Sequence, residues 1–102
     1  MRIIELDAAD WKTVRDFYDV LLPALGAPEG HGCSIDSLLD SMVWGGMNAI
    51  EPPYTVRIKN AQALPKEIIN HINLLAHYIP EHRAEYRARE GEDVDVNVEI
   101  VP

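Results

Sequence analysis

The sequence predicts an α/β fold: a small three-stranded, mainly parallel sheet with helices packed mainly on one face. Three short segments of strand-type residues alternate along the chain with segments of helical periodicity. Connections that contain a helix favour parallel strands and right-handed crossovers. The last strand alternates strictly, with Asp95, Asn97 and Glu99 opposite its apolar residues, so one face of the sheet is expected to stay open.

Length and composition indicate one domain, residues 1–102, of which 47% are hydrophobic. The single cysteine cannot form an internal disulfide, which fits a reducing compartment. No apolar segment approaches the roughly 18 residues that a membrane-spanning helix needs, and the N-terminal residues lack the apolar segment of a secretory signal. We therefore expect a cytoplasmic protein.

The first strand is expected at Arg2–Leu6, followed by an amphipathic helix with Asp7 or Asp10 as its N-cap. Pro23 should kink or end this helix, and Gly26 completes the stop. The apolar residues of this segment recur at helical spacing: Trp11, Val14, Phe17, Tyr18, Leu21, Leu22 and Leu25.

The segment Pro28–Met42 predicts a glycine-rich turn followed by a short second helix. Ser34 is a good N-cap, because its hydroxyl can accept a hydrogen bond from a free backbone N–H of the first turn. Asp36 and Asp40 lie four residues apart and therefore project from the same side of this helix. Its buried surface is expected to come from Leu38, Leu39 and Met42.

The second half of the chain repeats the pattern of strand, helix and strand. Tyr54–Lys59 alternates β-branched and aromatic residues and predicts the second strand. Pro65 suits the first turn of a long helix, which Pro80 should break or kink before a further helical segment at Glu81–Arg89. Val94–Val101 predicts the last strand. The buried face of the long helix is expected to hold Ile68, Ile69, Ile72, Leu75, Ala76 and Ile79.

Charge narrows the classes of partner. Nine Lys and Arg against seventeen Asp and Glu give a net charge of −8. This sign disfavours direct binding to nucleic acid or to an anionic membrane. A basic protein partner would instead be attracted.

Enzymatic and metal-binding patterns are absent from the sequence. Cys33 lies two residues after His31, which is no established spacing for a thiol nucleophile and its base. His71 and His82 would share a helical face about 16 Å apart, too far for a common metal ion. We expect no catalytic residue, no metal and no cofactor.

Asp40 is the residue that folding explains least. Asp36 lies in the first helical turn, where a carboxylate suits the helix dipole. Asp40 lies beyond that benefit and opposes Asp36, a like-charge arrangement that costs a few tenths of a kcal/mol. A solvated acidic face and a contact surface for a basic partner both fit this pattern.

One segment combines an acidic helix with a preceding loop, through Leu25, Pro28, Glu29, Gly32, Ile35, Asp36, Leu38 and Asp40. This combination resembles the barstar family, small cytoplasmic inhibitors of secreted bacterial ribonucleases. The order of the elements is also similar to that of the family, so the resemblance implies a barstar-like fold.

The resemblance further implies that this loop and helix plug a ribonuclease active site. Asp40 then matches the principal inhibitory aspartate, Asp36 matches its companion, and the free protein is a monomer. The expected partner-binding residues are Glu29, Gly30, His31, Ser34, Asp36, Leu39, Asp40 and Trp44.

Several positions depart from the family pattern. Gly30 and His31 stand where family members often have an aromatic pair, Ser34 replaces an asparagine, and Leu39 replaces a tryptophan. An acidic contact of the family's last helix falls on Tyr86. The acids that flank this position are Glu85 and Glu90.

Two functions from different classes follow. The first is an inhibitor or immunity protein that blocks a basic secreted ribonuclease or related toxin, with helix carboxylates as phosphate mimics. The second is a non-catalytic interaction or regulatory module with a barstar-like fold, whose partner is not a ribonuclease.

Overall fold

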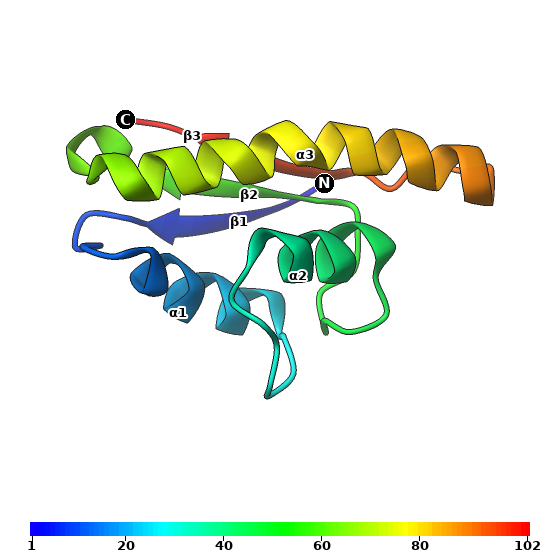
Figure 1. Cartoon of the computed structure of the whole chain (residues 1–102), viewed down its shortest axis with the longest axis horizontal. Helices are drawn as coiled ribbons and strands as arrows, with labels where there is room; N and C mark the ends of the chain where they lie inside the picture. Colours follow the sequence, from blue (N-terminus) through cyan, green and yellow to red (C-terminus); the bar gives the residue numbers. More distant parts are fainter.

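A computed structural model describes the whole chain, residues 1–102, and confirms the parallel α/β fold (Figure 1). Strands β1 (Arg2–Asp7), β2 (Tyr54–Lys59) and β3 (Val96–Ile100) form one sheet in the order β1-β2-β3, and both pairs are parallel. Because right-handed crossovers in this strand order place both connections on one side, the helices cover a single face.

The two faces of the sheet differ as the alternation predicts. Ile4, Val56 and Val98 are in register on the face that meets the core. On the opposite face Glu5, Arg57 and Glu99 are in register, and Arg57 forms ion pairs with both carboxylates. The sheet therefore has one apolar face and one solvated, charged face.

Helix α1 (Val14–Leu25) begins later than the apolar periodicity suggests. Its N-cap is Thr13, which forms a capping box with Asp16, so the predicted caps Asp7 and Asp10 are wrong. The predicted stop at Gly26 is confirmed, because this residue is the C-cap with φ of 67°. A Cβ atom at Gly26 would lie 2.6 Å from the Cβ of Ala49, so the position also needs glycine for close packing.

Helix α3 (Lys66–Glu90) is one continuous helix, so the predicted break at Pro80 is wrong. The fully buried side chains of α3 all lie before the proline, at Ile68, Ile72, Leu75 and Ile79. Beyond the exposed Pro80, the helix is held by contacts of His82 and Tyr86 with Trp44 and by the hydrogen bond of Arg83 to Asn97. A short 3-10 helix, η2 (Ala61–Ala63), precedes α3.

One hydrophobic core joins the sheet to the three α-helices. Helix α3 contacts α1, the second helix α2 (Ile35–Leu39) and β3, and Figure 1 shows it spanning the molecule. A polar contact crosses the α1–α3 boundary, where the Tyr18 hydroxyl lies 2.6 Å from His71 Nε2. Burial raises the pKa of Tyr18 to about 12 and lowers that of His71 below its ordinary 6.5.

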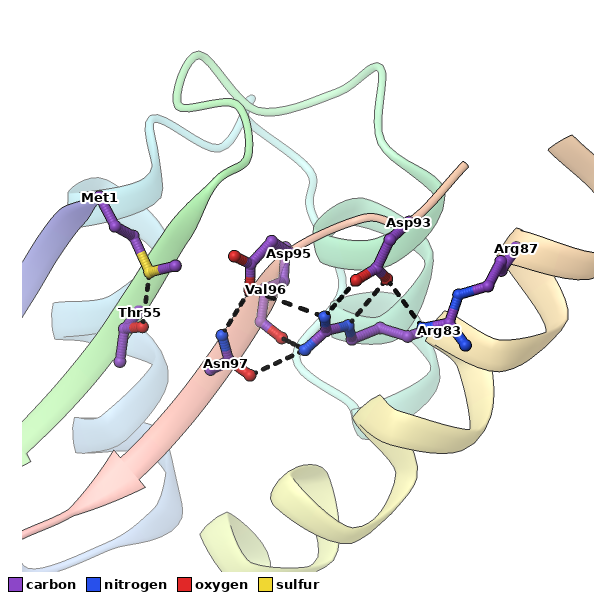
Figure 2. A network of polar contacts seen from close by, with 8 residues as sticks. All are labelled: Met1, Thr55, Arg83, Arg87, Asp93, Asp95, Val96 and Asn97. Atoms are coloured by element: carbon purple, nitrogen blue, oxygen red, sulfur yellow. Dashed lines mark hydrogen bonds and ion pairs between the residues drawn. The ribbon is translucent and has the colours of Figure 1, made fainter. Parts of the chain in front are cut away.

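Arg83 fixes the loop between α3 and β3 (Figure 2). Its guanidinium donates two hydrogen bonds to the Asp93 carboxylate, at 2.7 and 3.3 Å, and one to Asn97 Oδ1 at 2.8 Å. Arg87 reaches the same Asp93 carboxylate at 3.3 Å. These hydrogen bonds hold the pKa of Asp93 below its ordinary 3.8. The side chain of Arg83 is only 19% exposed, so this network is partly shielded from water.

Replacing Arg83 by glutamine should lower the free energy of unfolding by about 2 kcal/mol, because several charge-assisted hydrogen bonds are lost together. Urea denaturation of the two proteins measures this difference. Arg15→Gln is the matched control, since it removes an exposed i, i+4 ion pair with Asp19 and should leave the midpoint unchanged. Equal effects of the two substitutions would contradict the role of the network.

The free energy of unfolding should fall as the pH drops below about 6.5. The pKa of His71 is lower in the folded protein than in the unfolded chain, so the unfolded chain takes up the proton first as the pH falls. Proton uptake therefore stabilises the unfolded state relative to the folded state in this range. The slope between pH 7.5 and 5.5 should flatten in His71→Gln and persist in His77→Gln, whose side chain is exposed. A slope that is unchanged in His71→Gln would contradict this assignment.

Candidate partner-binding site

The site is built on α2 and the turn that continues it. Helix α2 passes directly into a π-helical turn, η1 (Asp40–Trp44). Ser34 caps α2 as predicted, because its Oγ accepts a hydrogen bond from the backbone N–H of Ser37 at 3.1 Å. A Cβ atom at Gly32 would lie 2.3 Å from Ser37 Oγ, so a larger residue there would require the Ser37 hydroxyl to move from the hydrogen bond it accepts from Ser34.

Asp36 and Asp40 lie one helical turn apart on the same side. The backbone N–H of Asp40 donates to the carbonyl oxygen of Asp36, which confirms the predicted i, i+4 relation. Both residues are exposed. The structure contains eight ion pairs, and neither carboxylate takes part in one or in a side-chain hydrogen bond. Both carboxylates are therefore free to accept hydrogen bonds from another molecule.

The surrounding sequence contains no cation to neutralise them. Residues 16–56 hold no Lys or Arg, although they include six acidic residues. The cations of the chain lie on the open face of the sheet, on α3 and near the N-terminus. The absence of Lys and Arg from this range can be seen in the sequence, but a search for short motifs does not detect it.

His31 fastens the preceding loop to the helix. Its Nδ1–H donates to the carbonyl oxygen of Gly32 at 2.7 Å, and its Nε2 lies 2.8 Å from the hydroxyl of the buried Ser41. The Ser41 hydroxyl donates to the carbonyl oxygen of Leu38 at 3.3 Å, so it joins the imidazole of His31 to the backbone of α2. Sequence reasoning missed Ser41, because nothing local relates it to a histidine ten residues earlier.

A small depression of about 130 Å³ lies between this loop and η1. The structure brings three of the predicted residues together there, namely Gly30, His31 and Asp40. Ser37 and Met47 also line the depression, and Met47 is 48% exposed. The arrangement places a free carboxylate beside an imidazole and an exposed apolar side chain.

The other predicted residues lie outside this depression. Glu29 is exposed in the loop, and Trp44 is half-buried at the end of η1. The prediction that Leu39 contacts a partner is wrong, because its side chain is 2% exposed and packs in the core. Leu39 stands where the family pattern has a tryptophan, and its side chain points into the core instead of toward solvent.

The last helix contributes less free charge than its sequence suggests. Glu85 is paired with Arg89 across a turn of α3 at 3.0 Å, while Glu90 is exposed and unpaired. Tyr86 is half-buried against Trp44, with the ring centroids 5.4 Å apart. Of these acids, Glu85 alone is engaged in an ion pair, while Asp36, Asp40 and Glu90 are unpaired.

The structure does not bring together the residues that a thiol-based active site or a metal site would need. Cys33 is exposed, and both ring nitrogens of His31 bond to other residues, so the two do not form a coupled pair. No three His, Cys, Asp or Glu side chains gather as a group that could hold a metal ion. No helix has the length and apolar character needed to cross a membrane.

One family matches this chain and agrees with its fold. A search of curated proteins finds no match. Residues 1–99 match the family described as Barstar (barnase inhibitor), which is nearly the whole of the 102-residue chain. The chain belongs to the barstar family.

Proposed function

We propose that this protein binds a basic ribonuclease and blocks its active site, with Asp36 and Asp40 in the places of RNA phosphates. The family description, a barnase inhibitor, supports the class of partner. The observation that carries the proposal is Asp40 itself: an exposed carboxylate beside a depression, in a part of the chain without Lys or Arg.

The chemistry of the contact follows from the geometry. A ribonuclease holds phosphate with Arg, Lys or His, and a carboxylate can accept the same charge-assisted hydrogen bonds. Two carboxylates one helical turn apart can meet two neighbouring cations at once. Enclosure in the interface strengthens each bond, because water is excluded from it.

The proposed action needs no chemical step by the inhibitor. Members of this family are inhibitors rather than enzymes, and occupation of the cleft is enough to exclude RNA. In this proposal the chain acts as a monomeric immunity protein in the cytoplasm. The net charge of −8 would speed its encounter with a basic partner.

Asp40→Asn should weaken the complex by about 3–5 kcal/mol, because the partner's cations lose a buried counter-charge. Isothermal titration and cleavage of a fluorogenic RNA, with barnase and a panel of secreted basic ribonucleases, measure this loss. Most of the effect should appear as faster dissociation.

Asp10→Asn is the matched control, since Asp10 is also exposed and unpaired but lies before α1. It removes the same charge and should change only the association rate at low salt. Equal affinity losses in Asp10→Asn and Asp40→Asn would contradict a specific contact at Asp40. Absence of inhibition across the panel, with a partner that lacks a basic cleft, would favour the interaction-module alternative.

A further inference from the structure

The largest cavity of the molecule lies one turn beyond Asp40. It has a volume of about 420 Å³ and opens where η1, the loop before β2 and the loop after α3 meet. The backbone N–H of Gly45 bonds to the carbonyl of Asp40, so the same turn that presents this aspartate forms one wall of the cavity. The cavity is therefore continuous with the surface proposed to meet the ribonuclease.

One side of the cavity is aromatic and fixed in orientation. The rings of Trp44 and Tyr86 both line it, with their centroids 5.4 Å apart. The indole Nε1–H of Trp44 donates to His82 Nδ1 at 3.1 Å, which holds the plane of the indole. Aromatic faces of this kind attract cations, and Trp does so most strongly.

The mouth of the cavity is acidic. Glu51 and Glu92 line it, are exposed, and form neither ion pairs nor side-chain hydrogen bonds. Asp93, the third acid of the lining, is already held by Arg83 and Arg87. The cavity thus offers two free carboxylates beside an aromatic wall.

The chain itself shows what this aromatic wall accepts. The guanidinium carbon of Arg89 lies 5.2 Å from the centroid of the Trp44 ring. Arg89 does not line the cavity, and its Nη2 is paired with Glu85. This internal contact shows that the Trp44 ring accepts a guanidinium as its neighbour.

We propose that this cavity receives an arginine side chain of the protein partner, stacked on Trp44 and paired with Glu51 and Glu92. Arginine fits better than lysine, because its planar guanidinium stacks on aromatic rings and bonds carboxylates in a fork. The identity of the partner rests on the proposed function, but the cavity is a second contact, separate from Asp36 and Asp40.

Nuclear magnetic resonance tests the cavity without any partner. Titration with blocked arginine (N-acetyl-arginine methylamide) should move the Trp44 indole N–H signal in a saturable way. The signal of Trp11 should stay in place, since that residue is 7% exposed in the core. The double variant Glu51→Gln, Glu92→Gln should raise the Kd for blocked arginine at least about 5-fold.

Glu67→Gln, at the far end of α3, is the matched control and should leave the titration unchanged. No saturable shift at Trp44, an unchanged Kd in the double variant, or equal binding of blocked lysine would overturn the proposal. Asp40→Asn should not affect this titration, although it should abolish tight ribonuclease binding. Failure of the cavity and failure of the proposed function are therefore distinguishable.

Discussion

The structure depends on one constraint: three parallel strands in sequential order must be joined by crossovers on the same face. Every helix then shares a single core with the apolar face of the sheet. Helix α3, the longest element, contacts α1, α2 and β3, and closes this core along its length. The short α2 is held at one end of this layer, so its outward side is left free for another molecule.

The distribution of charge follows from the same layout. Arg57 is held between carboxylates on the open face of the sheet, and Arg83 and Arg87 fasten the loop after α3. Each of these cations stabilises a structural junction. None lies on α2 or its flanking loops, where the acidic residues remain uncompensated. The molecule thus separates charges that hold the fold from charges that are open to a partner.

Local patterns predicted the strands, the cap at Ser34, the parallel sheet and the i, i+4 relation of the two aspartates, because each depends on residues close in sequence. The start of α1 was missed, since the capping box of Thr13 and Asp16 competes with earlier aspartates for the same role. The continuity of α3 through Pro80 depends on tertiary contacts on both sides of it, with core packing before the proline and contacts of His82, Arg83 and Tyr86 after it. The burial of Leu39 and the bond between His31 and Ser41 arise from tertiary packing, which periodicity does not encode.

The π-helical turn Asp40–Trp44 has a consequence for how this surface tolerates changes in length. A π turn holds one residue more than an α turn. The wider turn accommodates this residue locally, so the chain after it is spared the rotation of about 100° that an added residue causes in an α-helix. Trp44, at the end of this turn, contacts Tyr86 and His82, while Asp40 stands at its start. The spacing of this turn, and not only its composition, therefore links the aspartate to the aromatic wall.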